Sequence, residues 1–293
     1  MRFLIGDEDP SPPPSPRDRG EGVWLPLPHQ RERVGVRAGA RRQPVGDLSS
    51  TPLARTGVLL LHSVVPAGLC AHWLALIDRR YAMPGRGAIN ASDYSVHSSS
   101  LRLRAVPEIA LAAVWRAIGH GELRRALESA LGARLACDAD ECWIRRQYAI
   151  GNYPPLHAPH GWHQDGALRF DFLGRGVDLS APDALLDMAT CWIALSACGG
   201  TEAPGLELIA RRLPGLLEPA ELTQAHLSAS FAAADFCRPQ MAPGDALLLR
   251  GDVLHRSHLT PAMRCDRTSL ELRVFPANLL PARLAGDLMT PLV

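Results

Sequence analysis

The chain contains no lysine, and all 31 of its basic residues are arginine. This absence excludes enzymes whose chemistry requires a lysine, namely pyridoxal-phosphate enzymes, imine-forming aldolases and P-loop nucleotidases. With 30 acidic residues the net charge is only +1. Nucleic-acid-binding surfaces carry a clear excess of positive charge, so we expect no nucleic-acid partner.

The sequence also lacks long apolar runs and closely paired cysteines. Its longest apolar stretch, Val58–Leu61 followed by Val64 and Val65, is interrupted by His62 and Ser63. It is far shorter than the ~18 residues that a membrane span needs, and no secretory signal is evident at the N-terminus. Seven cysteines without a CxxC pair disfavour both a disulfide framework and a structural zinc site. We therefore expect a cytoplasmic protein with no membrane partner.

The composition changes along the chain. Residues 1–57 are rich in proline, arginine and glycine and have few periodic apolar positions, which predicts a flexible segment. A basic arm that contacts a partner is the alternative interpretation of this segment. We expect residues 58–293 to form a single domain, because that length is ample to bury a core.

The apolar spacing predicts helices before strands. Apolar residues recur at helical spacing over Pro66–Arg80 and over Pro107–Leu135, where Gly119 and Gly121 divide the second stretch into two helices. We expect a helical part at residues 66–136, a β core at 138–276 and one helical insert at 219–234. Together these features predict an α+β fold whose β part is a sandwich or barrel. The expected strands are Cys142–Tyr148, Ala189–Leu195, Leu206–Ile209, Ala246–Leu249 and Thr268–Phe275.

The segment 157–166, with the sequence HAPHGWHQDG, is the most informative in the chain. In extended backbone His163 and Asp165 point to the same side, so both can hold one metal ion. A second imidazole from elsewhere would complete the facial triad of non-haem Fe(II) enzymes. A zinc cluster formed by His157, His160 and His163 is a competing hypothesis, although Pro159 and Gly161 disfavour the helix that would align the three rings.

A third ligand is available near residue 255. Two turns, at Pro243–Asp245 and Gly251–Asp252, enclose a short apolar strand, and His255 follows the second turn. From this position its imidazole could project into a barrel. His258 is the competing ligand, but it would face the other way on an extended strand.

Arg267 and Ser269 begin the final predicted strand and share one of its faces. A guanidinium with a neighbouring hydroxyl suits the carboxylate of a cosubstrate at the closed end of a pocket. Arg273 also lies on this face and is the alternative, while the nearby Ser269 favours Arg267.

These pieces, in this order, resemble the phytanoyl-CoA dioxygenase (PhyH-like) family of Fe(II)/2-oxoglutarate oxygenases over roughly residues 140–276. The resemblance rests on WHQDG at 162–166, TCWIAL at 190–195, GLELI at 205–209, PGD at 243–245, His255 and Arg267. It implies a double-stranded β-helix (jelly-roll, cupin-like) core with flanking N-terminal helices. It also implies Fe(II), 2-oxoglutarate and O₂ as cofactor and cosubstrates.

Carried over residue by residue, the resemblance implies three iron ligands, His163, Asp165 and His255. Arg267 would bind the distal carboxylate of 2-oxoglutarate with help from Ser269. Gln147 matches a strand position near the cosubstrate in some members of the family.

Two positions refine what the resemblance implies. After Ile209 the family often has Pro-Gly-Ser-His, whereas this chain has ARRLP at 210–214, so the substrate cannot be inferred from the family. Asp165 is retained, whereas halogenating relatives replace this ligand with a small residue. We therefore expect hydroxylation of a small-molecule substrate, with release of succinate and CO₂.

Two other functions stay open at this point. The first is a cupin-type metalloenzyme that does not use 2-oxoglutarate, such as an epimerase or a dioxygenase acting on its substrate alone. The second is a non-catalytic β-barrel that binds a ligand.

Overall fold

The structure is a computed structural model that describes residues 53–83, 94–95, 99–138, 141–154, 157–166, 185–277 and 289–292. All of them belong to the compact unit formed by residues 44–293. The segment predicted to be flexible, residues 1–57, lies outside the described residues as far as residue 52. Within the described parts of the chain, no helix has both the length and the apolar character needed to cross a bilayer.

Nine antiparallel strands form the larger of two sheets. Its main path runs β1-β10-β7-β12-β5-β3-β2, while β4 pairs with β12 and β13 pairs with β4. The strands of this sheet are β1 (Val58–Leu61), β2 (Tyr94–Ser95), β3 (Ser100–Arg102), β4 (Leu135–Asp138), β5 (Trp143–Gln147), β7 (Ala189–Ala194), β10 (Ala246–Arg250), β12 (Arg267–Pro276) and β13 (Met289–Leu292).

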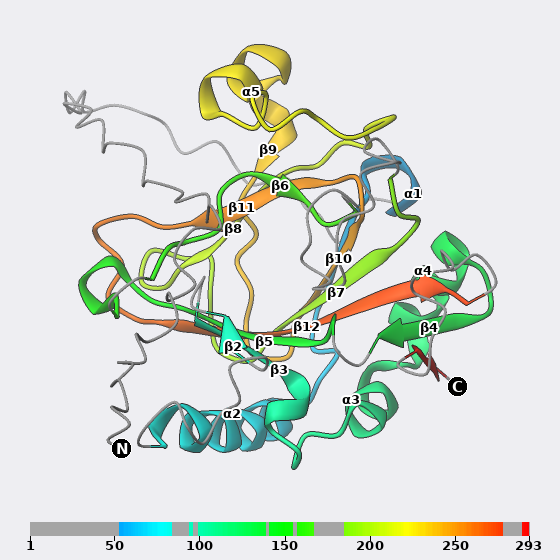
Figure 1. Cartoon of the computed structure of the whole chain (residues 1–293), viewed down its shortest axis with the longest axis vertical. Helices are drawn as coiled ribbons and strands as arrows, with labels where there is room; N and C mark the ends of the chain where they lie inside the picture. Colours follow the sequence, from blue (N-terminus) through cyan, green and yellow to red (C-terminus); the bar gives the residue numbers. More distant parts are fainter. Residues whose placement is uncertain are drawn as a thin grey trace, which may run out of the picture. The chain divides into compact units, whose positions relative to one another are not determined.

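Four shorter antiparallel strands form a second sheet in the order β6-β11-β8-β9. They are β6 (His163–Gln164), β8 (Gly205–Ile209), β9 (Phe236–Cys237) and β11 (Leu254–His258). This sheet faces the larger one, and β6 and β11 lie across the interior from β5 and β12 (Figure 1).

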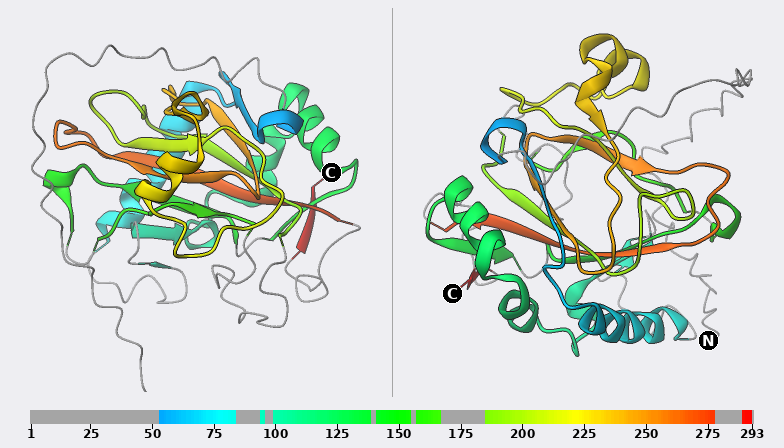
Figure 2. Two further views of the ribbon diagram at one scale, coloured as in Figure 1. Left: turned by 90° about the horizontal axis from the view of Figure 1, so that it is seen from above. Right: turned by 180° about the vertical axis from the view of Figure 1, so that it is seen from behind.

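Helices cover the outer faces of both sheets. Helices α2 (Ala67–Ala82) and α3 (Leu111–Ile118) lie beneath the larger sheet, and α5 (Gln224–Ser230) lies beside the smaller one (Figure 2). Helices α1 (Leu53–Thr56) and α4 (Gly121–Leu131) are the other two α-helices of the described residues. The apolar faces of α2 and α3 are buried: Trp73, Ile77 and Trp115 pack in one cluster with the sheet residues Leu101 and Ile144.

Strand β12 shows how the sheet positions a polar interior. Leu270, Leu272 and Val274 point outward into the apolar cluster between the larger sheet and the helices. Because successive side chains alternate between the two faces of a strand, Arg267, Ser269, Glu271 and Arg273 point inward, and all four are buried. The sheet therefore carries a row of polar groups into the space between the two sheets.

The remainder of that space is apolar. Residues of β1, β7, β8 and β10 fill it, among them Leu60, Trp192, Leu208 and Leu247. One part of the interior is therefore packed core, and the part beside β12, β6 and β11 is left for a polar site.

The α+β class predicted from the sequence is confirmed, and each of the five expected strands is present within one residue of its expected ends. The stretch 107–135 contains two helices, as expected, although residues 107–110 precede the first of them. The insert at 219–234 is α-helical only over Gln224–Ser230, and a 3₁₀ turn follows at Ala233–Asp235.

The order of helices first and strands after was wrong. Strand β1 precedes every long helix and pairs with β10, while β3 precedes α3 and pairs with β5. The β core is therefore not confined to residues 138–276. The folded part also begins before residue 58, since Leu53 is buried in the main apolar cluster. The apolar pattern identifies such a run as buried, but it does not show which distant strand it pairs with.

The Pro243–Asp245 turn gives a test of this architecture. Gly244 has φ +95°, and a Cβ on it would lie 2.1 Å from the carbonyl oxygen of Val65. We predict that Gly244→Ala lowers the free energy of unfolding by about 2 kcal/mol or more, because a left-handed conformation and a backbone clash act together. Gly68→Ala in α2, where a Cβ meets nothing within 4 Å, is the control and should leave stability unchanged or slightly higher. Equal urea midpoints for the two variants would contradict the prediction.

Candidate metal centre

Two histidines face each other across neighbouring strands. His163 on β6 pairs in register with His255 on β11, and their ring centroids are 4.2 Å apart. They are 92 positions apart in the sequence, and one antiparallel strand pair brings them together. Both side chains consequently enter the interior at one place.

The residues around His163 fix the local backbone. Gln164 points away from the site. On that other side its amide nitrogen donates to the carbonyl of Asp252, and its amide oxygen accepts from the backbone N–H of Leu217. A Cβ on Gly166 would lie 2.9 Å from the Gly251 carbonyl oxygen, so glycine permits a close approach of the two loops. With Gln164 anchored on one side, His163 and Asp165 are both directed to the other.

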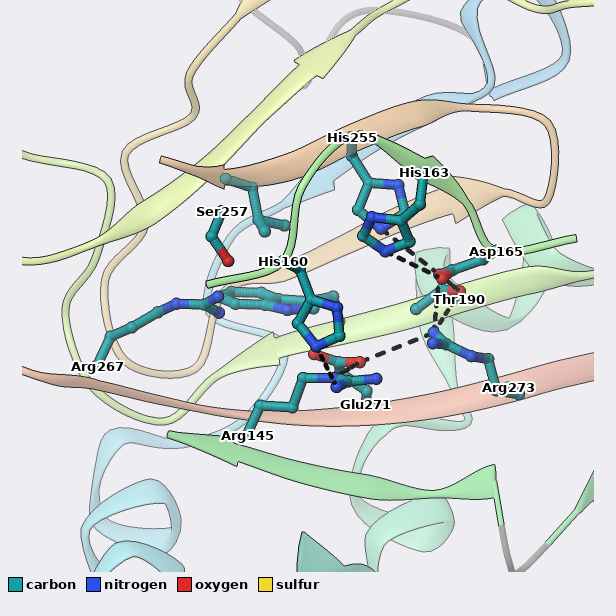
Figure 3. A pocket seen from close by; sticks show the side chains of 12 residues that line it. Arg145, His160, His163, Asp165, Thr190, His255, Ser257, Arg267, Glu271 and Arg273 are labelled. Atoms are coloured by element: carbon teal, nitrogen blue, oxygen red, sulfur yellow. Dashed lines mark hydrogen bonds and ion pairs between the residues drawn. The ribbon is translucent and has the colours of Figure 1, made fainter. Parts of the chain in front are cut away.

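His163, Asp165 and His255 bring their ligand atoms within 4.8 Å of one another. Within the part of the chain that the structure describes, this is the one group of three or more such side chains that could hold a metal ion. His157 and His160 do not belong to it, so the described residues do not form the alternative zinc cluster. Figure 3 shows the two imidazoles above the carboxylate of Asp165.

Backbone carbonyls orient both imidazoles. Nδ1 of His163 lies 2.7 Å from the carbonyl oxygen of Gly161, and Nδ1 of His255 lies 3.1 Å from that of Val253. A carbonyl oxygen can only accept, so each Nδ1 carries a hydrogen and each Nε2 is the ring nitrogen left to face a metal ion. Metal-binding histidines are commonly fixed by such bonds.

The electrostatics favour the protonation states that a metal requires. Burial and the neighbouring His255 lower the pKa of His163 from 6.5 to about 3, although Asp165 opposes this shift. Burial by itself would raise the pKa of Asp165, but Arg273 and the two imidazoles outweigh it and hold that pKa below its usual range. At neutral pH the site therefore offers a neutral His163 and a charged carboxylate, the forms that bind metal ions.

Two donors hold one oxygen of Asp165. Nη1 of Arg273 donates to Oδ2 at 2.8 Å, and the hydroxyl of Thr190 donates to the same atom at 2.5 Å. The carboxylates of Asp165 and Glu271 raise the pKa of Arg273 despite its burial. Arg273 was the alternative to Arg267 for binding a cosubstrate carboxylate, but in the structure it binds Asp165 of the candidate metal cluster.

Arg267 occupies another wall of the same pocket (Figure 3). Arg267 is 3% exposed, and its guanidinium donates to Oγ of Ser269 at 3.2 Å and lies 4.8 Å from the ring centroid of Trp192. No acidic side chain among the described residues forms an ion pair with it, and its Nε has no hydrogen-bond partner there. Burial accordingly lowers its pKa. A buried cation without an anion is the group that a bound carboxylate would neutralise.

The pocket is also lined by four further polar side chains, Arg145, His160, Ser257 and Glu271. Sequence reasoning had not assigned Ser257 or Glu271 to the site. Nε of Arg145 donates to Glu271 at 2.6 Å, and Nη1 of Arg145 lies 2.9 Å from Nε2 of His160. Ser257 lines the pocket between His255 and Arg267. The signal for Ser257 was its position two residues after His255 on an extended strand, whereas Arg145 could be found only by knowing that β5 pairs with β12.

Three other predicted positions have different surroundings. Gln147 lies opposite Arg267 in the β5–β12 register, but its Nε2 contacts Nε2 of His157 at 2.9 Å, and it does not line the pocket. Ser269 is buried against Arg267 and is also outside the pocket lining. His258 lies at the end of β11 and is not part of the metal cluster.

No protein-family model matches the chain, and no curated protein matches its sequence. Solved structures do resemble it. AviO1 from Streptomyces viridochromogenes Tue57 has a TM-score of 0.56 at 14% identity, covering 80% of this chain and 98% of that chain. The epimerase SnoN in complex with Fe³⁺, alpha ketoglutarate and nogalamycin RO has a TM-score of 0.55 at 16% identity, covering 83% and 96%. EctD from S. alaskensis with 2-oxoglutarate and 5-hydroxyectoine has a TM-score of 0.55 at 16% identity, covering 78% and 74%.

At these identities the likeness shows the fold. It confirms the predicted double-stranded β-helix (jelly-roll, cupin-like) core with flanking helices. The narrower resemblance to the phytanoyl-CoA dioxygenase family stays a prediction.

The choice between His255 and His258 can be tested directly by metal binding. We predict that His255→Ala weakens Co(II) binding by more than about 100-fold, because even the loss of a partner that only orients a ligand costs ~10–100-fold. His258→Ala, on the same strand, is the matched control and should bind Co(II) like the wild type. A reversal of the two results in a calorimetric titration would move the third ligand to His258.

The lowered pKa of His163 makes the stability of the metal-free protein depend on pH. An unfolded chain protonates this histidine near pH 6.5, whereas the folded chain does so only near pH 3. As pH falls through this window the unfolded state binds the additional proton, so the free energy of unfolding decreases.

We predict that from pH 7 to pH 5 the wild type loses more stability than His163→Gln does. The difference is at most about 2 kcal/mol, because that is the full linkage free energy of one such histidine between these two pH values, and the 30% exposed surface of the His163 side chain reduces it. His157 and His258 also have lowered pKa values. Because the wild type and His163→Gln both retain these two histidines, their contributions to the pH dependence cancel in the comparison. Parallel stability curves for the two proteins would contradict this prediction.

Proposed function

We propose that the protein is an Fe(II)- and 2-oxoglutarate-dependent oxygenase that hydroxylates a small-molecule substrate, with release of succinate and CO₂. One observation carries the proposal: a cluster of two histidines and one aspartate shares its pocket with Arg267, a buried arginine that has no acidic partner among the described residues. The cluster alone fits many metalloenzymes. The additional uncompensated cation is what specifies an anionic cosubstrate.

The donor atoms fit ferrous iron. Nε2 of His163, Nε2 of His255 and a carboxylate oxygen of Asp165 form the two-nitrogen, one-oxygen set of non-haem Fe(II) oxygenases. Such a set on one side of an ion leaves the other side open. When bound, the iron would supply the chemistry that activates O₂ with the keto acid and oxidises the substrate.

The chain itself supplies position and electrostatics. Arg267 would bind the distal carboxylate of 2-oxoglutarate, and Ser269 and Trp192 hold that guanidinium in place. Ser257, which lines the pocket between His255 and Arg267, is placed to donate a hydrogen bond from its hydroxyl to the same anion. Arg267 and Asp165 are both buried, so charge interactions at these two groups are stronger than at a surface.

Solved structures of the same fold support the choice of cofactor and cosubstrate. SnoN was crystallised with Fe³⁺ and alpha ketoglutarate, and EctD with 2-oxoglutarate. HygX from Streptomyces hygroscopicus, with a TM-score of 0.50, 16% identity and coverage of 80% of this chain and 92% of that chain, was crystallised with nickel and 2-oxoglutarate. These ligands belong to those proteins and extend to this chain as part of the proposal.

Hydroxylation is favoured over halogenation because Asp165 keeps its place in the cluster, which leaves no ligand position for a halide. A 2-oxoglutarate-dependent epimerisation is the other outcome to test, since SnoN is an epimerase of this fold. The mass of the product separates the two: hydroxylation adds one oxygen atom, whereas epimerisation leaves the mass unchanged.

Arg267→Ala tests the cosubstrate site. We predict that it raises the Kd for 2-oxoglutarate in the anaerobic Fe(II) protein by at least about 30-fold, because losing one partner of a buried charge pair costs ~2 kcal/mol or more. The measurement follows the visible charge-transfer band of the chelated keto acid. Arg264→Ala, which removes an exposed arginine three residues earlier, should leave the Kd unchanged.

The same assay separates the competing functions. A metalloenzyme that does not use 2-oxoglutarate would bind iron but show no charge-transfer band and no effect of Arg267→Ala. A non-catalytic barrel would release no succinate above background with Fe(II), ascorbate and 2-oxoglutarate across a broad panel of substrates. Either result would overturn the proposal.

A further inference from the structure

The two oxygens of Asp165 have different surroundings. Oδ2 accepts hydrogen bonds from Thr190 at 2.5 Å and from Arg273 at 2.8 Å. Oδ1 accepts none from the described residues and lies 3.7 Å from Nε2 of His163. A carboxylate oxygen has about two lone-pair sites, so Oδ2 has both of them occupied and Oδ1 is available.

The orientation of the carboxylate makes this difference important. Oδ2 lies 3.7 Å from Nε2 of His255, the same distance that separates Oδ1 from Nε2 of His163. Each oxygen therefore faces one of the imidazoles, and a metal ion between the rings could contact both oxygens. Without a further constraint the carboxylate could bind the ion with two atoms and occupy one additional coordination position.

Arg273 and Thr190 supply the constraint as a connected pair. Nη1 of Arg273 also donates to the hydroxyl oxygen of Thr190 at 2.8 Å, so the hydroxyl hydrogen is directed to Asp165. Arg273 is 2% exposed, and its Nη1 lies 3.8 Å from the buried carboxylate of Glu271. Burying a guanidinium is costly, and replacing a whole buried ion pair with apolar groups is often neutral for stability, so stability alone does not account for this pair.

We propose that Arg273 is a positioning residue that, with Thr190, reserves Oδ2 of Asp165 and presents Oδ1 alone to the metal. This inference rests on the proposed function. With one oxygen bound, a six-coordinate ion keeps three open positions, enough for a chelating keto acid and O₂. With both oxygens bound it keeps two, and the keto acid and O₂ compete for them.

Thr190→Val is the decisive variant, because it removes the hydroxyl donor while it keeps the size of the side chain and the charge of Arg273. Arg273→Met removes the other donor, and Arg273→Lys restores a charge with a single-point donor. Leu272→Met is the control: it changes the neighbouring residue of β12, which faces the helices, and it preserves core volume.

The measurement counts water molecules on bound Mn(II) by electron–nuclear double resonance in ¹⁷O-labelled water. We expect three waters in the wild type and in Leu272→Met, and two in Thr190→Val and Arg273→Met. The Kd for Mn(II) should not weaken by more than about threefold, since a second oxygen is gained. The Kd for 2-oxoglutarate in the anaerobic Fe(II) protein should rise about tenfold or more, and Arg273→Lys should recover part of this loss.

A purely structural role gives a different pattern, in which metal affinity, cosubstrate affinity and melting temperature fall together and the water count stays at three. That pattern, or two waters in the wild type, would overturn the inference and leave the proposed function standing. Failure of the wild type to bind metal or 2-oxoglutarate would overturn both. If Arg273→Met does not fold, Thr190→Val still decides the question.

Discussion

The site depends on a balance of buried charge in the space between the two sheets. Four charged groups follow one another with alternating sign, in the order Arg145, Glu271, Arg273 and Asp165, and each neutralises the next. A buried charge without a counter-ion is costly, so the members of this chain hold one another in place. Arg267 stands apart: it is the buried arginine that this chain does not neutralise. The asymmetry leaves one buried positive charge of the pocket without an acidic partner among the described residues.

Parts of this arrangement follow from the sequence. A histidine and an aspartate two positions apart share a face of any extended strand, so His163 and Asp165 could be paired before the fold was known. The same alternation placed Arg267 with Ser269, and apolar periodicity identified α2, α3 and α4. These inferences succeed because they depend on backbone geometry over a few residues.

Other parts depend on which strands become neighbours, and no local pattern determines this. Arg145 belongs to an arginine pair that reads as a solvated face, and its contact with Glu271 exists because β5 lies beside β12. Strand β1 was visible only as an apolar run until it paired with β10. Arg267 and Arg273 share a face of one strand, and only the position of Asp165 showed that Arg273 binds the aspartate.

The placement of Arg267 and Arg273 on a single uninterrupted strand has a consequence for the evolution of the pocket. The interval between Arg267 and Arg273 is three two-residue repeats of the backbone, so both guanidiniums leave the same face of the strand. Slipping β12 by one position would exchange its polar face for its apolar one, and slipping it by two positions would carry both arginines together by about 6.6 Å. A change in the spacing between the two guanidiniums would therefore need a substitution that moves one arginine along the polar face of β12, a central strand that is buried along its whole length.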